Sequence, residues 1–439
     1  MNVVVSGPFG VGSLADEALL AGFLAYLKSA KHNITVLSPE PANVIEMHDV
    51  DALQLPSPGA ILSAPKVWAA LSKSHLFIVT SAGIINEKGE VPARTWLGQA
   101  EHARRAGART AIMSLGAAEI ADPRERVRVQ RQLHNFTDYI SVRDAESKRI
   151  VIGYGISATR VSHNGDFTLT LASQKVSTSA ADRDRCVGIF LNATVPTRSE
   201  FGASTAPFSE DAIGIYRDLI QRLQEKKRRV RLFHDDTDLA REAAERICED
   251  FDEDQIDLPD PGDDIETTRE RLAACGVAFS PSLHGLILAA TCGVMPIGLT
   301  PEPGAEPFLD SLGLKTNALG EFTADAVMKA AEDALPEAAG GLEKILAKVQ
   351  GLLKKQAQDA RTLELLVPRR DRRDTKGAGD DEDEDGEDIG EPRAHGGRDR
   401  DRGFRGRSTS RARQAGARGR SRGERPARKK ADADPWFNE

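Results

Sequence analysis

The chain has 439 residues and a formal net charge of −8, and this length suggests two or three domains. Hydrophobic residues make up 40% of it but aromatic residues only 5%, which favours the aliphatic core of parallel sheets. No apolar run is long enough to cross a membrane and no signal-peptide pattern is present, so we expect a cytoplasmic protein. The cysteines lack the spacing of disulfide frameworks or metal sites, so we expect no metal: Cys186, Cys248, Cys275 and Cys292.

Residues 1–172 alternate between apolar strand patterns and helical patterns, which indicates a doubly wound parallel sheet. We predict strands at Asn2–Ser6, Asn33–Leu37, Leu76–Thr80, Thr110–Ser114, Tyr139–Val142 and Arg160–Ser162. We predict helices at Ala15–Ala30, Trp96–Arg105, Arg124–Phe136 and Ala145–Ile152. The polar segment 173–185 has little periodicity and is predicted to link two domains.

A second alternating series covers residues 186–335 and predicts another α/β domain. We predict strands at Cys186–Leu191, Arg229–Phe233, Gln255–Leu258, Val277–Phe279 and Met295–Leu299. We predict helices at Asp211–Lys226, Thr237–Phe251, Leu286–Thr291 and Thr323–Leu335. A closing segment, 336–368, contains a further helix at Gly341–Leu366 that is long enough to lie across both domains.

Residues 369–439 have the composition of a disordered tail. Asp380–Asp388 is nearly all acidic, and Arg393–Arg428 carries thirteen arginines spaced by small residues. The arginines favour weak binding to polyanions through counterion release. The alternative is a solubilising tail whose basic block pairs with its own acidic block. In either case we expect the tail to be dispensable for folding.

Small and polar residues follow several predicted strands, at the edge where open α/β sheets bind ligands. Gly7–Ser13 joins the first strand to a helix that carries Asp16 and Glu17 in its first turn. Glycines there allow an anion to approach the backbone closely, although a tight strand–helix turn explains them equally well. Ser81, Gly83 and Gly116 stand at the ends of two later strands.

The segment Val277–Leu299 reads as strand, turn, helix and strand, with Ser280, Ser282 and His284 as the polar side chains of its turn. His284 would lie beyond a strand end, close to free backbone N–H groups of a helix. The alternative is a capping serine and a histidine that is hydrogen-bonded in the core.

The domain pattern resembles the GT-B architecture, in which two Rossmann-like domains face one cleft. Within that architecture the chain resembles the polysaccharide pyruvyl transferase family. Short motifs in a common order carry this resemblance: Gly12–Ala18, Thr80–Gly83, Val142–Ser147, Asp166–Leu169, Ser282–Gly285 with Ala289–Pro296, and Phe308–Gly313. The chain departs from the family where Ser282 replaces an arginine. It also lacks the arginine that the family often has after the first strand of the second half, where this chain reads Leu191–Thr194, and Arg198 is close enough in sequence to substitute there.

The resemblance implies transfer of a pyruvyl group from phosphoenolpyruvate, the donor substrate, to a sugar of a cell-surface polysaccharide precursor, without a further cofactor. His284 is then the candidate general acid, because the enol carbon must accept a proton. Arg143 is the best retained cation for the donor, although an ion pair with Asp144 would also explain it. Asp16 and Glu17 would orient acceptor hydroxyls or merely favour their helix start. The candidate substrate-binding residues are Gly12, Ser13, Asp16, Glu17, Ser81, Gly83, Gly116, Arg143 and Ser282.

Two other functions fit the same pattern. A nucleotide-sugar glycosyltransferase would need an acidic residue near the ribose, for which Glu302 and Glu306 are candidates. A non-catalytic relative that binds a glycan or sugar nucleotide would explain the loss of the donor arginine at Ser282. The sequence indicates neither the acceptor sugar nor the oligomeric state.

Overall fold

A computed structural model describes residues 1–55, 64–80, 85, 93–174, 176, 186–191, 210–235, 237–249, 251, 256–260, 262–299, 304–314 and 323–366, without the side chains of 93–95 and 336–342. Met1–Pro368 forms one compact unit, and Arg369–Glu439 is grouped separately. The predicted tail lies outside the described residues, as does most of the predicted linker 173–185. The domain boundaries therefore stay predictions.

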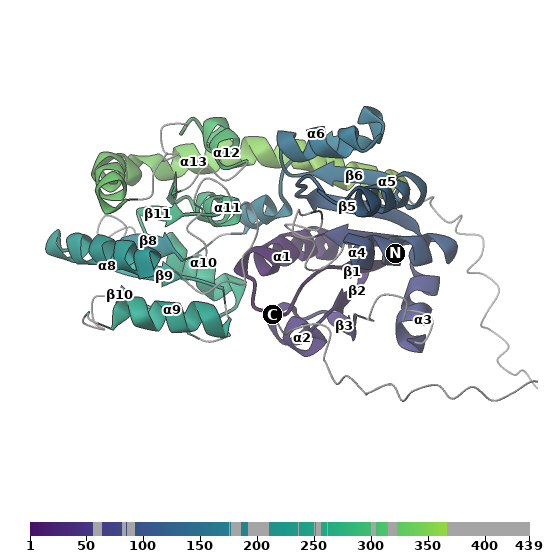
Figure 1. The fold of residues 1–439 in the computed structure, drawn as a ribbon, viewed down its shortest axis with the longest axis horizontal. Helices are drawn as coiled ribbons and strands as arrows, with labels where there is room; N and C mark the ends of the chain where they lie inside the picture. Colours follow the sequence, from purple (N-terminus) through teal and green to yellow (C-terminus); the bar gives the residue numbers. More distant parts are fainter. Residues whose placement is uncertain are drawn as a thin grey trace, which may run out of the picture. The chain divides into compact units, whose positions relative to one another are not determined.

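The first sheet consists of parallel strands in the order β3-β2-β1-β4-β5-β6-β7 (Figure 1). Their bounds are β1 (Asn2–Ser6), β2 (Asn33–Ser38), β3 (Asp51–Gln54), β4 (Leu76–Thr80), β5 (Arg109–Leu115), β6 (Tyr139–Val142) and β7 (Val161–His163). Val5 of β1 pairs with Val36 on one side and with Ile78 on the other. The strand order therefore reverses between β1 and β4, and ligands bind beyond the carboxyl ends of strands at such a point.

Helices cover both faces of this sheet because successive side chains of each strand enter opposite cores. Phe77 and Val79 of β4 enter the core beneath α3 (Pro65–Lys73), α4 (Ala93–Arg105), α5 (Pro123–Phe136) and α6 (Ala145–Gly153). Ile78 enters the core beneath α1 (Leu14–Ser29), α2 (Pro41–His48) and the 3-10 helix η3 (Phe167–Ser173).

The second sheet repeats this arrangement in the order β10-β9-β8-β11-β12, again with parallel pairing. Its strands are β8 (Cys186–Phe190), β9 (Arg229–Phe233), β10 (Ile256–Asp257), β11 (Val277–Ser280) and β12 (Met295–Gly298). Its helices are α8 (Glu210–Glu225), α9 (Asp238–Cys248), α10 (Ile265–Ala273), α11 (Leu283–Thr291) and α12 (Ala305–Leu312). The order reverses between β8 and β11, so the turn after β11 lies at a second expected ligand position. The prediction of two Rossmann-like α/β sheets is confirmed.

One helix, α13 (Ala324–Leu366), replaces the two closing helices that the sequence predicts, and that prediction was wrong. Leu335, Ile345 and Val349 all enter the same core of the second sheet. Packing against that core therefore keeps the chain helical at Pro336 and at the glycines that follow it, although these residues have low helix propensity.

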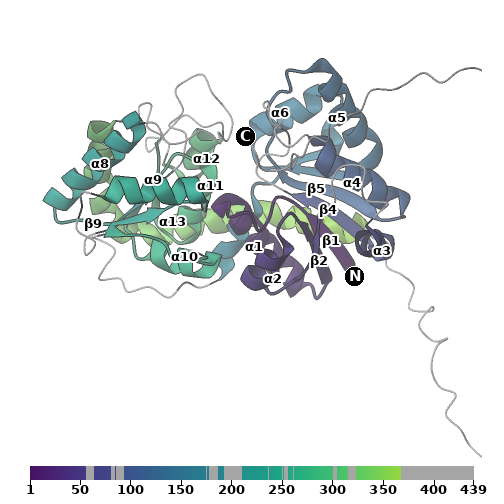
Figure 2. The same cartoon turned by 60° about the horizontal axis from the view of Figure 1, so that its bottom comes forward.

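The far end of α13 packs on the first sheet, so the prediction that it reaches both is confirmed (Figures 1 and 2). Asp359 anchors it there. Its carboxylate accepts hydrogen bonds from the hydroxyls of Tyr139 and Ser141, each at 2.5 Å, and from Asn164 Nδ2. Burial raises the pKa of Asp359, although these three donors act to lower it.

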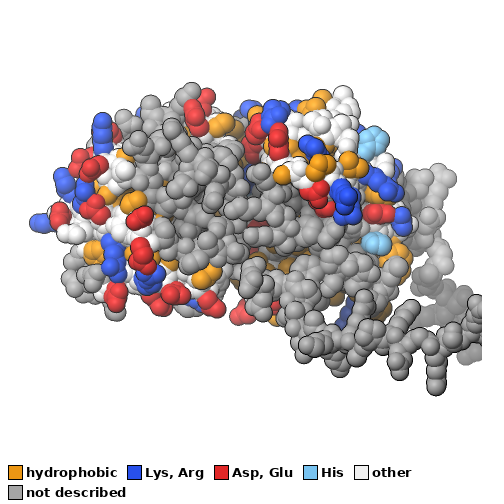
Figure 3. Space-filling view, viewed as in Figure 1, with side chains coloured by type: hydrophobic (Ala, Val, Ile, Leu, Met, Phe, Trp, Pro, Cys, Tyr) orange, Lys and Arg blue, Asp and Glu red, His pale blue; other side chains and the backbone are white. Residues whose placement is uncertain are grey.

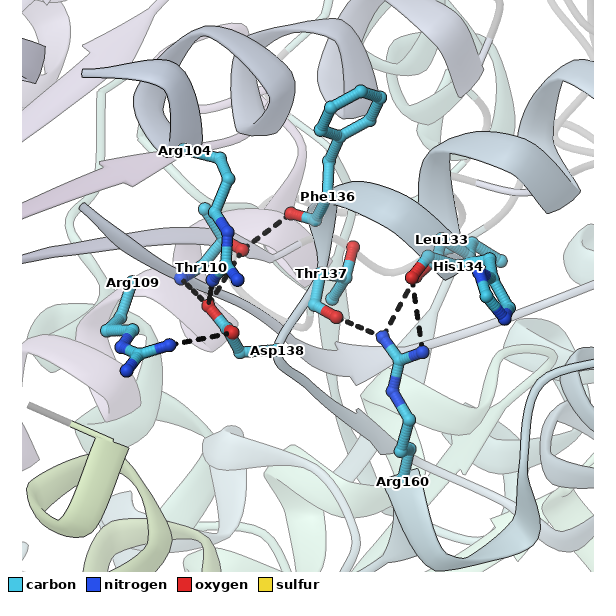
Figure 4. A network of polar contacts seen from close by, with 9 residues as sticks. All are labelled: Arg104, Arg109, Thr110, Leu133, His134, Phe136, Thr137, Asp138 and Arg160. Atoms are coloured by element: carbon cyan, nitrogen blue, oxygen red, sulfur yellow. Dashed lines mark hydrogen bonds and ion pairs between the residues drawn. The ribbon is translucent and has the colours of Figure 1, made fainter. Parts of the chain in front are cut away.

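A second polar network holds the amino ends of β5 and β6, on the edge opposite the expected ligand side (Figure 4). Asp138 accepts hydrogen bonds from Arg104, from Thr110 N at 2.9 Å and from Arg109 at 3.3 Å. Arg160 donates to backbone carbonyls at the end of α5, including Thr137 O. This network fixes the start of β6 and therefore supports the sheet rather than a ligand.

On the face shown in Figure 3, Lys and Arg side chains are interspersed with Asp and Glu side chains over the described surface. In the part of the chain that the structure describes, no helix has both the length and the apolar character needed to span a membrane.

Candidate functional site

The glycine-rich turn Gly7–Ser13 folds back on itself and on α2. Gly10 and Gly12 both have positive φ angles, of 80° and 84°, which glycine adopts without strain. Glu17 Oε1 accepts a hydrogen bond from Gly10 N at 2.6 Å, and Glu17 Oε2 lies 2.7 Å from His48 Nε2. Both carboxylate oxygens of Glu17 are therefore engaged by the protein, and they hold the turn in shape.

The turn before α11 presents His284 in the first turn of the helix. Ser282 caps the helix, because its Oγ accepts a hydrogen bond from Gly285 N at 3.2 Å. The helix therefore begins at Leu283, whereas the sequence predicts a start at Leu286. An added Cβ on Gly285 would lie 2.2 Å from Ser280 Oγ, so only glycine fits this close approach. His284 is thus fixed by the backbone and is 6% exposed.

His284 Nε2 is shared between two side chains of the first sheet. It lies 3.2 Å from Arg143 Nη1 and 3.3 Å from Asp166 Oδ2. The guanidinium can only donate, so a hydrogen bond with Arg143 requires Nε2 without a proton. The carboxylate can only accept, so a contact with Asp166 is favourable when Nε2 carries one. The trio therefore has two arrangements that differ by one proton.

Asp166 follows β7 and is held rigidly. Its Oδ1 accepts a hydrogen bond from Thr168 N at 2.8 Å. Ser114, at the end of β5, accepts from Phe167 N at 3.1 Å and donates to Gly165 O at 3.4 Å, so the residues on both sides of Asp166 are fixed. Ser114 has a φ of 51°, a strained conformation for a residue with a side chain.

The electrostatics of Asp166 depend on His284. Burial acts to raise the pKa of Asp166, but the proximity and charge of His284, together with Thr168, outweigh it and lower the pKa below its ordinary value of 3.8. Asp166 Oδ2 is buried and has no aligned hydrogen-bond partner among the described residues, so its approach to His284 is an ion-pair contact. One oxygen of a buried carboxylate thus points at the shared nitrogen.

Arg143 is oriented by its own neighbours. Its Nε donates to Asp144 Oδ2 at 3.1 Å, so the ion pair that was considered as an alternative does form. Asp144 in turn caps α6 by accepting from Ser147 N at 2.7 Å. The same guanidinium reaches His284 through Nη1, so this pairing and a role beside His284 are compatible.

Asp235, just beyond β9, reaches from the second sheet to the start of α1. Its Oδ1 accepts a hydrogen bond from Leu14 N at 2.8 Å, beside the capping residue Ser13. The residue is exposed, yet surrounding protein atoms desolvate its carboxylate and this raises the pKa of Asp235. The hydrogen bond from Leu14 N and the charge of His284 act in the opposite direction and lower the pKa of Asp235.

These contacts bring several predicted residues together and add two. Two sets of contacts join the carboxyl ends of the two sheets: His284 contacts Arg143 and Asp166, and Asp235 accepts from Leu14 N next to Ser13. We call Ser13, Arg143, Asp166, Asp235 and His284 together the junction site. Sequence reasoning placed Asp166 at a strand end without assigning it to the site, and it did not single out Asp235. Both are acidic residues within a few positions of the end of a predicted strand, which is the local signal that could have pointed to them.

The remaining predicted residues lie elsewhere or cannot be placed. Gly116 is buried directly after β5, next to the strand end that precedes Arg143. Glu306 lies in the first turn of α12. Four candidates fall outside the described residues, namely Ser81, Gly83, Arg198 and Glu302. Among the residues that are described, no group of His, Cys, Asp and Glu could hold a metal ion.

Solved structures of other proteins share this fold. A putative UDP-N-acetylglucosamine 2-epimerase from Listeria monocytogenes has a TM-score of 0.52 and 13% sequence identity, over 78% of this chain and 90% of that one. HepE from Anabaena, in complex with UDP and glucose, has a TM-score of 0.53 and 13% identity, over 83% and 99%. UDP-GlcNAc 2-epimerase from Neisseria meningitidis, bound to UDP-GlcNAc, has a TM-score of 0.52 and 12% identity, over 83% and 99%. At these identities the likeness concerns the fold, which is GT-B-like.

Comparison with curated protein sequences finds no match to this chain. The profile of one protein family, described as polysaccharide pyruvyl transferase, does match it over residues 16–303. This range includes most of the first sheet, the whole second sheet and every residue of the junction site except Ser13. The chain belongs to the polysaccharide pyruvyl transferase family.

Proposed function

We propose that the protein transfers a pyruvyl group from phosphoenolpyruvate to two hydroxyls of a sugar in a cell-surface polysaccharide precursor. The observation that carries this proposal is the position of His284 Nε2 between the Asp166 carboxylate and the Arg143 guanidinium. A general acid needs a proton that is held in place before the reaction and a stable state after it is lost. Asp166 supplies the first condition, and Arg143, by donating to the bare nitrogen, supplies the second.

The proposed reaction changes two carbons of phosphoenolpyruvate, C3 and C2. The enol carbon C3 takes the proton from His284 Nε2, which makes C2 electrophilic. The first acceptor hydroxyl then bonds to C2, and the second replaces the phosphate as the C2–O bond to phosphate breaks. Because a ketal joins one carbon to two oxygens, the acceptor must offer two hydroxyls that can reach the same carbon.

The proposal is tested by incubating the full-length protein with phosphoenolpyruvate and a panel of lipid-linked and nucleotide-linked sugars, and by measuring phosphate release. We expect release only with an acceptor that has two suitable hydroxyls, and none with its monodeoxy analogue. His284→Ala should lower turnover by about 10²–10⁴-fold while the protein still unfolds cooperatively, although loss of the contact with buried Asp166 should lower the unfolding midpoint. His134→Ala, on the exposed side of α5, is the matched control and should retain full turnover. Wild-type protein that releases no phosphate with any acceptor would refute the proposal.

One observation favours a second candidate, a family member that binds a sugar without transferring pyruvate. Within the described part of the junction, Arg143 is already paired with Asp144, and Ser282 stands where the family has an arginine and caps α11. A donor with a phosphate and a carboxylate needs fixed cations or several oriented N–H groups. Binding of a sugar or sugar nucleotide, measured by calorimetry, without binding of phosphoenolpyruvate would favour this second function.

A further inference from the structure

Pyruvyl transfer requires a base as well as an acid. Each of the two acceptor hydroxyls loses its proton as its oxygen bonds to C2. Overall, one proton replaces the one that His284 gives to C3, and the other ends on the released phosphate. The transfer is therefore balanced without an outside acid or base, but a group in the site must accept the hydroxyl proton when the C–O bond forms.

Most carboxylates near the junction are already committed to the protein. Glu17 is held by Gly10 N and His48, and Asp144 is held by Ser147 N and Arg143. Asp166 is 1% exposed and faces His284. Asp16 accepts a hydrogen bond from the Ser13 hydroxyl at 3.0 Å and is 9% exposed. None of these four combines exposure with an available oxygen.

Asp235 differs from them in geometry. Oδ1 is fixed by Leu14 N at 2.8 Å, which orients the carboxylate. Oδ2 has no hydrogen-bond partner among the described residues, and the residue is exposed. It stands beyond the carboxyl end of β9, one strand away from the point between β8 and β11 where the second sheet reverses its strand order.

We propose that Asp235 is the catalytic base that accepts the proton of the attacking acceptor hydroxyl, with Oδ2 as the accepting atom and His284 as the acid on the donor side. This inference rests on the proposed function and identifies the acceptor side of the same site. The acceptor sugar would then lie between α1 and β9, where its hydroxyl can reach Oδ2. The partial desolvation of the carboxylate suits this role, because a raised pKa makes Asp235 a stronger base near neutral pH.

Two substitutions separate this role from the structural one. Asp235→Asn keeps an oxygen for Leu14 N but removes the basic oxygen. Asp235→Ala removes both. If Asp235 is the catalytic base, both variants should lose about 10²–10⁴-fold in kcat. The Asn variant should keep the wild-type unfolding midpoint and the wild-type affinity for phosphoenolpyruvate. The wild-type kcat should also fall as the pH drops through the raised pKa of Asp235, and this acidic limb should vanish from the residual activity of the Asn variant.

A different result is expected if Asp235 only caps α1 and takes no part in the reaction. In that case Asp235→Asn would turn over like the wild type, and Asp235→Ala would lose stability and activity together, which overturns the inference and leaves the proposed function intact. Wild-type protein that releases no phosphate with any acceptor overturns both. The assay is phosphate release by the full chain, with calorimetric binding of phosphoenolpyruvate and thermal unfolding measured on the same preparations.

Discussion

Asp166→Asn tests the contact between Asp166 and His284, because it replaces one carboxylate oxygen by an amide nitrogen and leaves the shape of the side chain unchanged. The amide oxygen can still accept from Thr168 N, which wild-type Oδ1 does at 2.8 Å. The amide nitrogen takes the place of Oδ2, which approaches His284 Nε2 to 3.3 Å. An amide nitrogen donates, so it favours an unprotonated Nε2, whose single lone pair accepts from Arg143 or from the new amide. The proton that His284 should deliver to the donor is then no longer held on Nε2.

The expected loss in kcat is about 10²–10⁴-fold, the usual contribution of a positioned general acid. The KM for the acceptor should change little, because Asp166 is 1% exposed and does not touch it. The assay is phosphate release under saturating phosphoenolpyruvate. Asp138→Asn is the matched control, because it makes the same chemical change in a hydrogen-bonded aspartate on the opposite edge of the sheet (Figure 4). Equal turnover by Asp166→Asn and the wild type would refute the proton-positioning argument.

The pH dependence of stability gives an independent check on Asp166. Its pKa in the folded protein is lowered from 3.8, so its ionised form is stabilised by folding. That contribution is fully present above about pH 4 and is lost as the pH falls through the lower folded pKa. The difference in unfolding free energy between the wild type and Asp166→Asn should therefore shrink over this acidic range. If the difference in unfolding free energy stays constant down to the folded pKa of Asp166, folding does not stabilise the ionised carboxylate, and the argument for its contact with His284 fails.

Three further substitutions test the surroundings of the site. Ser282→Arg should cost about 0.5–2 kcal/mol through loss of the α11 cap, as should the control Ser282→Ala, but only the arginine should tighten binding of phosphoenolpyruvate in calorimetry. Gly22→Ala would bring a Cβ to 2.1 Å from Phe167 O and should destabilise by about 1–3 kcal/mol in denaturant unfolding, whereas Gly214→Ala has nothing within 4 Å and should stabilise by up to about 1 kcal/mol. Asp359→Asn should gain stability over the wild type as the pH rises from about 4, because the raised pKa of Asp359 means that ionising the buried carboxylate opposes folding; thermal midpoints across pH 4–8 that stay parallel would contradict this.

Much of the fold could be predicted because buried strands leave a strong local signal. The predicted bounds of β1, β4, β6 and β9 equal the observed ones, and each is a short segment rich in buried apolar residues that is followed by a polar or small residue. The prediction missed α2, β3, α3, α10 and α12. In α2 only Val44 is buried, and β3 has no buried residue, so their sequences lack the periodicity that packing imposes elsewhere.

The site was less predictable because its contacts join distant parts of the chain. His284 and Arg143 could each be identified locally, but the 3.2 Å contact between them spans 141 residues. The Leu14–Asp235 contact spans 221 residues. Nothing in the local pattern of Asp235 distinguishes it from a solvated acid after a strand. Its proposed role as a base follows only from the way the two sheets meet at their carboxyl ends.

The two helix starts at the junction bear on where the proposed donor would bind. Helix N-termini are the usual places for a phosphate, and the sequence predicted such a place at Gly7–Ser13. In the structure Asp235 Oδ1 accepts a hydrogen bond from Leu14 N, the first N–H group of α1, and Ser282 caps α11. Both anion positions are thus partly taken by the protein, and one is taken by a negative charge that would repel a phosphate. The glycine-rich turn therefore fits the uncharged acceptor sugar better than the donor. In the proposed reaction the donor would then bind Arg143, and the sequence offers Arg198, which lies outside the described residues, as a further candidate cation. Arg198→Ala should accordingly raise the KM for phosphoenolpyruvate without changing the KM for the acceptor, and the reverse result would move the donor back to the start of α1.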